Sequence, residues 1–268
     1  MRQILKSSVY RISPNIGYLL SSIRFRRICK ERFLATQTQL AKKLFPSGEI
    51  FVMSGPFKGM KYYNEVVWGS ITPKWLGSYE FELHRTILEI SNRGYTNFID
   101  IGAAEGYYAV GLASLDPNLR IYTFDTDPYA RRLQKKLAHL NGSKNITIGK
   151  YCTYKKINQL ATTKTILICD IEGYEYQLLD PDRAEGLLHC DILVEVHGFT
   201  GLQAAEVERI LVQRFKHSHR IQRIASKVRC AKDWQNTCGY RLSNQELTIA
   251  LNEHRSNSQC WLWLTTPQ

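Results

Sequence analysis

The stretch Tyr95–Ala113, YTNFIDIGAAEGYYAVGLA, decides the fold of this 268-residue chain. It opens with a short apolar run, Phe98–Ile101, and then reaches two glycines, Gly102 and Gly106, with small residues between them. Beyond the second glycine, apolar residues recur at helical spacing. The stretch therefore predicts a strand, a tight turn and a helix. Such a turn lets the backbone approach a ligand, which the first free N–H groups of the helix would face.

The residues of this turn favour a cationic nucleoside over a dinucleotide. A dinucleotide-binding turn has the pattern G-x-G-x-x-G, but here Ala104 takes the place of the second glycine and Asp100 ends the strand. A carboxylate at that point repels a pyrophosphate and attracts an ammonium group. We therefore predict that the turn binds S-adenosylmethionine. The alternative is that the glycines serve packing alone.

A second mark of an adenosine ligand follows the next predicted strand, Arg120–Asp127. Asp125 follows Gly102 by 23 residues, near the roughly 20 expected between a nucleotide-binding turn and the carboxylate that binds the ribose. The two oxygens of one carboxylate match two vicinal hydroxyls. Asp127 and Pro128 are typical of a helix N-terminus, which leaves Asp125 for the ribose.

The rest of the chain alternates predicted strands with helices. Further strands are predicted at Asn145–Tyr151, Thr165–Asp170, Asp191–Val196, Arg220–Val228 and Cys260–Thr265, and further helices from near Ser78, at Leu202–Phe215 and at Asn244–Asn252. A hairpin is expected at Glu49–Tyr63. This alternation predicts an α/β fold with a mostly parallel sheet that helices cover on both faces.

Several acidic residues end these strands. In open parallel sheets the ligand lies outside the carboxyl ends of the strands, and Asp100, Asp125 and Asp170 all fall at that edge. Glu195 and His197 end a further strand, where they alternate with apolar residues and should point to one side.

Four phrases, FIDIGAAEGYY, YTFDTDP, LICDIEGYEYQLL and ILVEVH, resemble in their order and spacing the FkbM family of S-adenosylmethionine-dependent methyltransferases. The match covers Phe98–His197, and the D-x-E-G-x-E phrase at Asp170–Glu175 is its most specific part. The resemblance implies the Rossmann-like class I methyltransferase fold with seven strands. It also implies methylation of a hydroxyl on a sugar, a lipid or another small molecule.

The resemblance places the cofactor among residues that follow the first, second and fourth strands. Glu105 and Thr126 differ from the residues that the family most often has there. Cofactor contacts are expected at Asp100, Gly102, Ala103, Ala104, Glu105, Gly106, Asp125, Thr126 and Asp170.

Methyl transfer from a sulfonium is an in-line displacement, so the enzyme must align the acceptor oxygen and remove its proton. His197 is a candidate base because its ordinary pKa lies near neutrality; the alternative is a histidine that bonds a loop carbonyl. Asp170 is a second candidate, as base or as hydroxyl acceptor, and Glu172 lies beside it, where it also suits the first turn of a helix. These three side chains could ligate a divalent metal. The pattern is no recognised metal signature, and no metal is predicted.

Positive charge is concentrated at the N-terminus. The formal net charge is +12, and residues 1–50 hold ten Lys or Arg against two Glu. Residues 1–48 are therefore predicted to form a basic helical extension, followed by a lead-in segment at 49–94 and the cofactor-binding domain at 95–268. We favour a solvated extension on the core; the alternative is an amphipathic arm that touches an anionic membrane or a partner.

The cysteines and the hydropathy of the chain indicate its cellular compartment. Seven cysteines occur without a C-x-x-C pair, several of them inside apolar runs, and no run approaches 18 apolar residues. Buried reduced thiols, a cytoplasmic location and no transmembrane helix are predicted.

Other function classes fit less well. A nucleic-acid methyltransferase is suggested by the net charge, but enzymes that methylate base amines usually have a Pro-Pro-aromatic phrase after the fourth strand, and carboxylates follow it here. A non-catalytic binding protein would not need Asp100, Gly102, Gly106 and Asp125 together. A nicotinamide dehydrogenase lacks its glycine pattern. A small-molecule or glycan hydroxyl is the expected partner, and the oligomeric state is left open.

Overall fold

The computed structural model describes residues 36–267 apart from 68, 200, 235–238, 240–241 and 256–258. The strands are β1 (Asn97–Ile101), β2 (Arg120–Phe124), β3 (Ile146–Gly149), β4 (Thr165–Cys169), β5 (Asp191–Val196), β6 (Arg220–Ala225) and β7 (Cys260–Thr265). Helices are found over 36–44 and at α3 (Thr72–Leu76), α4 (His84–Asn92), α5 (Tyr107–Leu115), α6 (Pro128–Leu140), α7 (Tyr154–Leu160), α8 (Glu175–Leu178), α9 (Ala204–Phe215) and α10 (Asn244–Leu251). Short 3₁₀ turns lie at η1 (Phe81–Leu83), η2 (Glu185–His189) and η3 (Ala231–Asp233).

The strands form one seven-stranded sheet in the order β3-β2-β1-β4-β5-β7-β6. All pairs are parallel except those of β7, which runs antiparallel between β5 and β6. This is the class I methyltransferase fold, as predicted. The predicted bounds of β5 and β7 are confirmed to the residue.

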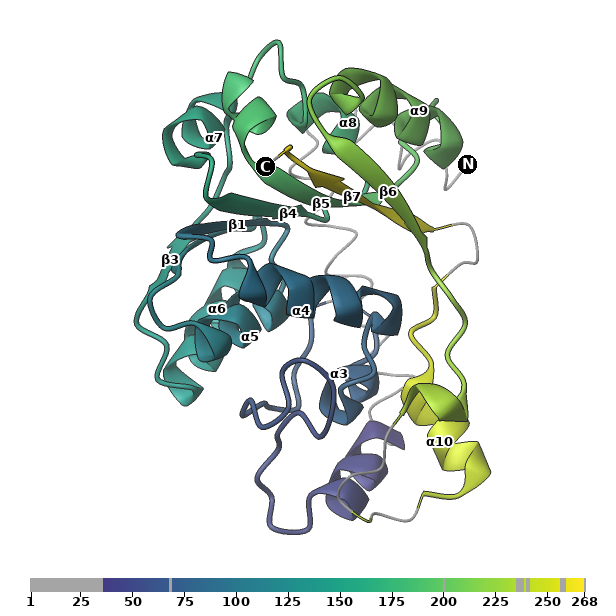
Figure 1. The fold of residues 1–268 in the computed structure, drawn as a ribbon. Coiled ribbons are helices and arrows are strands. Elements are labelled where there is room, and N and C mark those ends of the chain that lie inside the picture. The colour runs from purple at the N-terminus through teal and green to yellow at the C-terminus, as the bar shows by residue number, and fades with distance from the viewer. Residues whose placement is uncertain are drawn as a thin grey trace, which may run out of the picture.

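Helices cover both faces of the sheet (Figure 1): α4, α5 and α6 lie on one side, and α7, α8 and α9 on the other. Every residue of β1 is buried, because successive side chains enter opposite layers. Phe98 packs in one core with Leu112 of α5, whereas Ile99 packs in the other with Ile157 of α7. A strand buried on both faces is mostly apolar, and in β1 only Asn97 and Asp100 depart from this pattern.

The lead-in segment differs from the prediction. The helix expected from near Ser78 begins at His84; the 3₁₀ turn η1 takes the first part of the expected stretch, and the short helix α3 precedes it. Glu80 interrupts the helical run because it adopts a left-handed φ of 48°. The hairpin expected before it is a loop closed by one antiparallel bridge between Phe51 and Lys61.

Residues 36–94 pack onto the sheet instead of forming a body of their own. Phe45, after the helix over 36–44, makes edge-to-face contacts with Phe51 and Trp75, and these side chains share one core with the sheet. Lys43 pairs with Glu246 of α10 at 2.7 Å. Most of the predicted basic extension, residues 1–35, lies outside the described residues.

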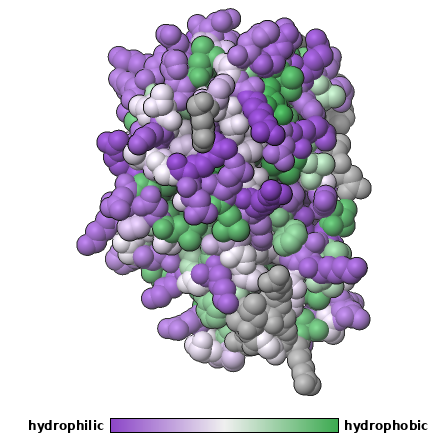
Figure 2. All heavy atoms as spheres, in the orientation of Figure 1, coloured by the Kyte–Doolittle hydropathy of each residue, from purple (hydrophilic) through white to green (hydrophobic). Residues whose placement is uncertain are grey.

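Among the described cysteines, Cys152, Cys169, Cys190 and Cys260 are buried free thiols and Cys230 is an exposed one, which confirms the expected reduced thiols for this part of the chain. Within the described residues, no helix combines the length and the apolarity needed to cross a membrane. On the face drawn in Figure 2, hydrophilic side chains predominate and hydrophobic ones lie among them in small groups.

Candidate active site

The glycine turn after β1 lies directly against the end of β4. Gly102 has a φ of +85°, and a Cβ there would lie 1.7 Å from the carbonyl oxygen of Asp170. Only glycine fits this approach. Ala104 also has a left-handed φ, of 46°, and Gly106 starts α5 with a φ of +92°. The predicted strand, turn and helix are therefore confirmed.

Asp125 connects this turn to the end of β2. Its Oδ2 accepts a hydrogen bond from the backbone N–H of Ala104 at 2.9 Å, and its Oδ1 accepts one from Asp127 at 2.8 Å. Burial raises the pKa of Asp125 to about 7, although both backbone hydrogen bonds act to lower it. Each oxygen keeps a second acceptor site, so a ribose contact stays a prediction. Asp127 caps α6, as expected.

Asp100 points its carboxylate into the interior of this edge. The side chain is buried, and its Oδ2 makes no hydrogen bond within the described part of the chain. Burial, together with the charges of Asp170 and Asp125, raises the pKa of Asp100 well above its usual value. A buried carboxylate oxygen without a donor is costly, and here it marks a position for a cationic or hydrogen-bond-donating group.

Glu105 has a structural role that the sequence did not reveal. Its side chain is fully buried and forms an ion pair with Lys74 of α3. It also accepts hydrogen bonds from the Tyr62 hydroxyl at 3.0 Å and from the backbone N–H of Val67 at 3.3 Å. Both oxygens of Glu105 therefore bond to the protein, and a cofactor contact at this residue stays a prediction.

The other expected cofactor residues lie in the same loops. Ala103 is buried in the turn, and Thr126 follows Asp125, where its carbonyl oxygen accepts a hydrogen bond from Arg131 at 3.0 Å. Their contacts with a cofactor stay predictions.

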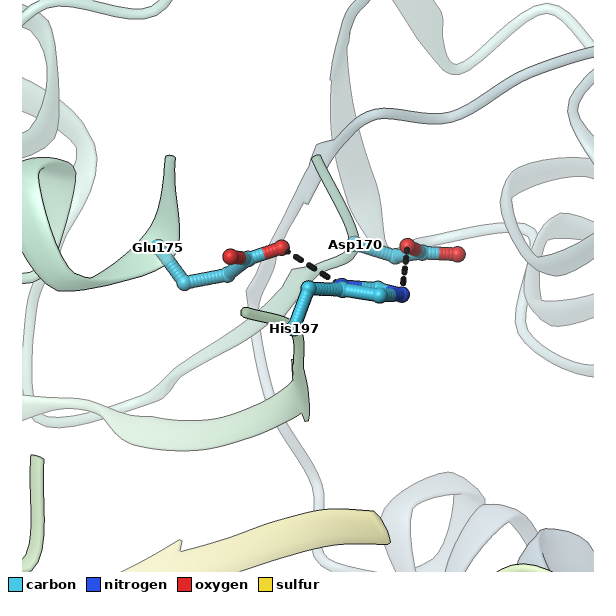
Figure 3. A group of neighbouring side chains, drawn as sticks. All are labelled: Asp170, Glu175 and His197. Carbon is cyan, nitrogen blue, oxygen red and sulfur yellow. Dashed lines mark hydrogen bonds and ion pairs between the residues drawn. The ribbon is translucent and has the colours of Figure 1, made fainter. Parts of the chain in front are cut away.

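A second group lies across the same edge, after β4 and β5 (Figure 3). Asp170 follows β4, Glu175 begins α8 and His197 follows β5. The imidazole Nδ1 of His197 lies 2.9 Å from Glu175 Oε1. The three predicted catalytic residues do come together, since Nε2 lies 3.9 Å from Asp170 and 3.8 Å from Glu172. Glu195 is 3.5 Å from Nε2, which confirms that it shares a side with His197.

These neighbours change the acid–base behaviour of the group. Burial alone would lower the pKa of His197, but the hydrogen bond to Glu175 and the charges of Asp170 and Glu195 raise it to about 10. Burial raises the pKa of Asp170 to about 6, while His197 acts to lower it. Burial also raises the pKa of Glu195 well above its usual value. The cluster is thus rich in negative charge that a cation would stabilise.

Backbone strain gathers near this edge. Ala104, Glu172 and Glu80 have φ values of 46°, 59° and 48°, a region that residues with a Cβ rarely occupy. Such residues cluster at functional sites. Glu80 lies near Asp100, whose pKa its charge helps to raise.

Sequence reasoning gave no role in the site to Glu175 and Arg255, and it placed Glu195 beside His197 without a role. Arg255 pairs with both Glu195 and Glu80, and no spacing rule links residues so far apart. Glu175 had a usable signal, because it closes the D-x-E-G-x-E phrase. Glu195 had one in its alternation with His197.

Comparison with known proteins finds similar solved structures but no family. No protein-family model and no curated protein matches the sequence. Among solved structures, the chain is similar to a putative O-methyltransferase from Klebsiella pneumoniae, at 9% identity and a TM-score of 0.46 over 92% of this chain and 100% of that one. It is similar to the O-methyltransferase TomG from Streptomyces achromogenes in complex with S-adenosylmethionine, at 13% identity and a TM-score of 0.47 over 70% and 80% of the two chains.

A third similar structure is a precorrin-6y methyltransferase from Geobacter metallireducens, at 9% identity and a TM-score of 0.44 over 69% of this chain and 87% of that one. Similarity of this degree gives no information on the activity or the substrate of this chain.

Proposed function

We propose that the chain is an S-adenosylmethionine-dependent methyltransferase of the FkbM type that methylates a hydroxyl of a small molecule, a sugar or a lipid-linked glycan. One observation carries the proposal: Asp100 in β1, Asp125 directly after β2 and Asp170 directly after β4 lie at the carboxyl ends of three adjacent strands, around a glycine turn that permits close backbone approach. The unpartnered buried oxygen of Asp100 adds a position for a cationic group.

Each of these residues has a distinct part in the proposal. The turn between Gly102 and Gly106 admits the cofactor, whose ammonium or sulfonium compensates the carboxylate of Asp100. Asp125 accepts the ribose hydroxyls with the acceptor sites that its two backbone hydrogen bonds leave free. The cofactor thereby supplies the positive charge that this edge of the sheet lacks.

The chemistry is a displacement at the methyl carbon. The acceptor oxygen bonds to the methyl group as the sulfur–carbon bond breaks, and its electron pair stays on sulfur to give S-adenosylhomocysteine. The acceptor proton leaves to Asp170, whose side chain is 29% exposed, whereas that of His197 is 10% exposed and is held by Glu175. Asp170 is thus the member of the pair that an acceptor reaches first.

Calorimetry with S-adenosylmethionine and S-adenosylhomocysteine tests the cofactor, with NAD as a negative control. We expect micromolar binding of both sulfur compounds that weakens at least tenfold in Asp125→Asn, about 1.4 kcal/mol of binding free energy. Asparagine is the suitable change because it keeps the size of the side chain and one acceptor oxygen, which retains one of the two hydrogen bonds from Ala104 and Asp127. Asp182→Asn, at an exposed position, is the matched control. Absence of binding by folded protein would contradict the proposal.

An acceptor screen then tests Asp170. In Asp170→Asn, turnover should fall about 100-fold or more, as for a lost general base. The affinity for S-adenosylmethionine is measured in the same variant, so that a lost base is distinguished from a lost cofactor contact. Unchanged turnover would remove Asp170 from the catalytic step.

A further inference from the structure

Only one of the two ring nitrogens of His197, Nδ1, is held by a hydrogen bond within the described residues. Its Nδ1 lies 2.9 Å from Glu175 Oε1, and this oxygen also accepts hydrogen bonds from the backbone N–H groups of Ile171 and Gly173, both at 3.1 Å. Glu175 is fully buried and acts here as an acceptor, so the ring hydrogen belongs on Nδ1. A metal ion that displaces the second ring proton, which the surrounding carboxylates hold on Nε2, would meet a lone pair there.

That lone pair faces carboxylates from two other segments. Nε2 lies 3.5 Å from Glu195 Oε2, 3.8 Å from Glu172 Oε2 and 3.9 Å from Asp170 Oδ1. His197 is about nine-tenths buried, and its Nε2 makes no hydrogen bond to any residue that the structure describes. The same holds, among those residues, for Asp170 Oδ1. Two buried atoms that lack hydrogen bonds in this part of the chain thus face one another as a loose ion pair.

The separations suit a shared ion better than hydrogen bonds. Bonds of about 2.0–2.2 Å from nitrogen and oxygen to a divalent metal place neighbouring ligand atoms about 3.0–3.5 Å apart. The shortest distance from Nε2 to a carboxylate oxygen, 3.5 Å, lies at the upper end of this range, and the other two exceed it by a few tenths of an ångström. Asp170, Glu175 and His197 each offer a ligand atom within 4.8 Å of the others.

We propose that His197 Nε2, Asp170 and Glu195 bind one divalent metal ion, with Glu172 as a further ligand. Glu175 is a positioning residue, because it holds the imidazole through Nδ1 as carboxylates do for metal-bound histidines (Figure 3). One imidazole with several carboxylates favours Mn²⁺ or Zn²⁺ over Mg²⁺, which prefers oxygen and water.

A sulfonium centre does not account for these contacts. It offers neither an N–H donor nor a vacant orbital to the lone pair of Nε2, whereas a metal ion accepts that lone pair. Arg255 neutralises part of the charge, but it pairs with Oε1 of Glu195 and leaves Oε2 directed at His197. The sequence left a metal at Asp170, Glu172 and His197 as an alternative and did not include Glu195, because no spacing rule joins Glu195 to Asp170; the fold brings them together by placing β4 beside β5.

The role of the ion rests on the proposed function, whereas its binding does not. The cluster lies at the same edge of the sheet as the glycine turn, since the backbone of Asp170 touches Gly102. The hydroxyl oxygen of the methyl acceptor is therefore the expected additional ligand of the ion, which would hold that oxygen in place.

Metal binding is measured on the full chain after treatment with a chelator and dialysis. Calorimetric titration with MnCl₂ should show one ion per chain, and MgCl₂ should bind at least tenfold more weakly. Pulsed electron paramagnetic resonance of the Mn²⁺ complex should show coupling to one imidazole nitrogen. This coupling should vanish in His197→Gln.

Three variants locate the site. Glu175→Gln should weaken Mn²⁺ binding about 10–100-fold, as loss of a residue that orients a ligand does. Glu172→Gln changes a side chain that is 53% exposed, so it keeps the fold and should also weaken binding. His189→Gln, at an exposed position, should bind Mn²⁺ as the unchanged chain does.

The outcomes separate this inference from the proposed function. The inference is overturned if the folded protein binds neither Mn²⁺ nor Zn²⁺ at a metal concentration of about 1 mM. A dissociation constant of that size corresponds to a binding free energy of about 4 kcal/mol. Binding that persists in Glu172→Gln and Glu175→Gln overturns the inference as well. Metal binding without S-adenosylmethionine binding supports the site and contradicts the proposed function; the reverse result leaves the proposed function and removes the metal.

Discussion

The two halves of the sheet's carboxyl edge are built by different means. At β1 and β2, the backbone makes the site: Gly102 meets the backbone of Asp170, and Asp125 accepts the N–H groups of Ala104 and Asp127. At β4 and β5, side chains make the site, with His197 surrounded by carboxylates. The first half is shaped by sterics and the second by charge.

The contrast matters because the two kinds of site fail in different ways. A turn that depends on close backbone approach loses its shape when a single Cβ is added. A cluster of like charges keeps its shape only while a counter-charge is present. Substitutions in the first half should therefore cost stability, and those in the second should change ligand binding.

The largest effect is expected from Gly102→Ala. The added Cβ would overlap the Asp170 carbonyl oxygen at 1.7 Å, and the residue would still need a φ of +85°. Steric overlap with the backbone and a left-handed φ should together remove about 4–5 kcal/mol of the free energy of unfolding. Urea unfolding followed by circular dichroism measures the loss.

Gly142→Ala is the matched control for this change. Gly142 also has a positive φ, of +68°, but no atom of the described residues lies within 4 Å of a Cβ built there. Only the backbone cost should remain, about 1 kcal/mol. Equal losses in the two variants would show that the contact between the turn and β4 is unimportant.

The sequence predicted the first half of the edge better than the second, for a physical reason. Apolar runs and glycines are local signals, so β1, the turn and Asp125 were all found at their positions. Contacts between distant segments leave no such signal. Arg255 reaches Glu195, and Lys74 reaches Glu105, only after the sheet and the lead-in segment have packed. The same applies to the start of α4, which depends on the left-handed φ of Glu80.

The next largest loss of stability is expected at the buried ion pair between Lys74 and Glu105, which lies in the glycine turn. Lys74→Met removes the ammonium that pairs with Glu105, whose carboxylate is fully buried. Breaking a buried pair leaves an uncompensated charge. The loss should be about 3 kcal/mol, the lower end for such a pair, because Tyr62 and Val67 still donate hydrogen bonds to Glu105. Chemical unfolding measures it.

A second substitution shows whether the buried charge is the cause. In Lys74→Met combined with Glu105→Gln, no unpaired charge is left, and the chain should regain all but about 1 kcal/mol. A double variant as unstable as Lys74→Met alone would mean that Lys74 acts by packing.

The smallest expected effect is the pH dependence of the free energy of unfolding that is due to Asp125, at the β1 and β2 half of the sheet edge. Its pKa is raised from 3.8 to about 7 in the folded chain, so the folded state binds the proton more tightly than the unfolded state does. This contribution to stability is complete below pH 3.8 and is lost as the pH rises through 7. Between pH 6 and 8 the loss should be about 1.4 kcal/mol.

Asp125→Asn isolates this contribution, because asparagine does not titrate and keeps an acceptor oxygen. Glu253, whose pKa burial also raises to about 7, gives a parallel loss in both proteins. The free energy of unfolding of the unchanged chain should therefore fall more steeply between pH 6 and 8 than that of the variant. Identical slopes would mean that the N–H groups of Ala104 and Asp127 keep Asp125 ionised, and that hydrogen bonding outweighs burial in the backbone-built half of the edge.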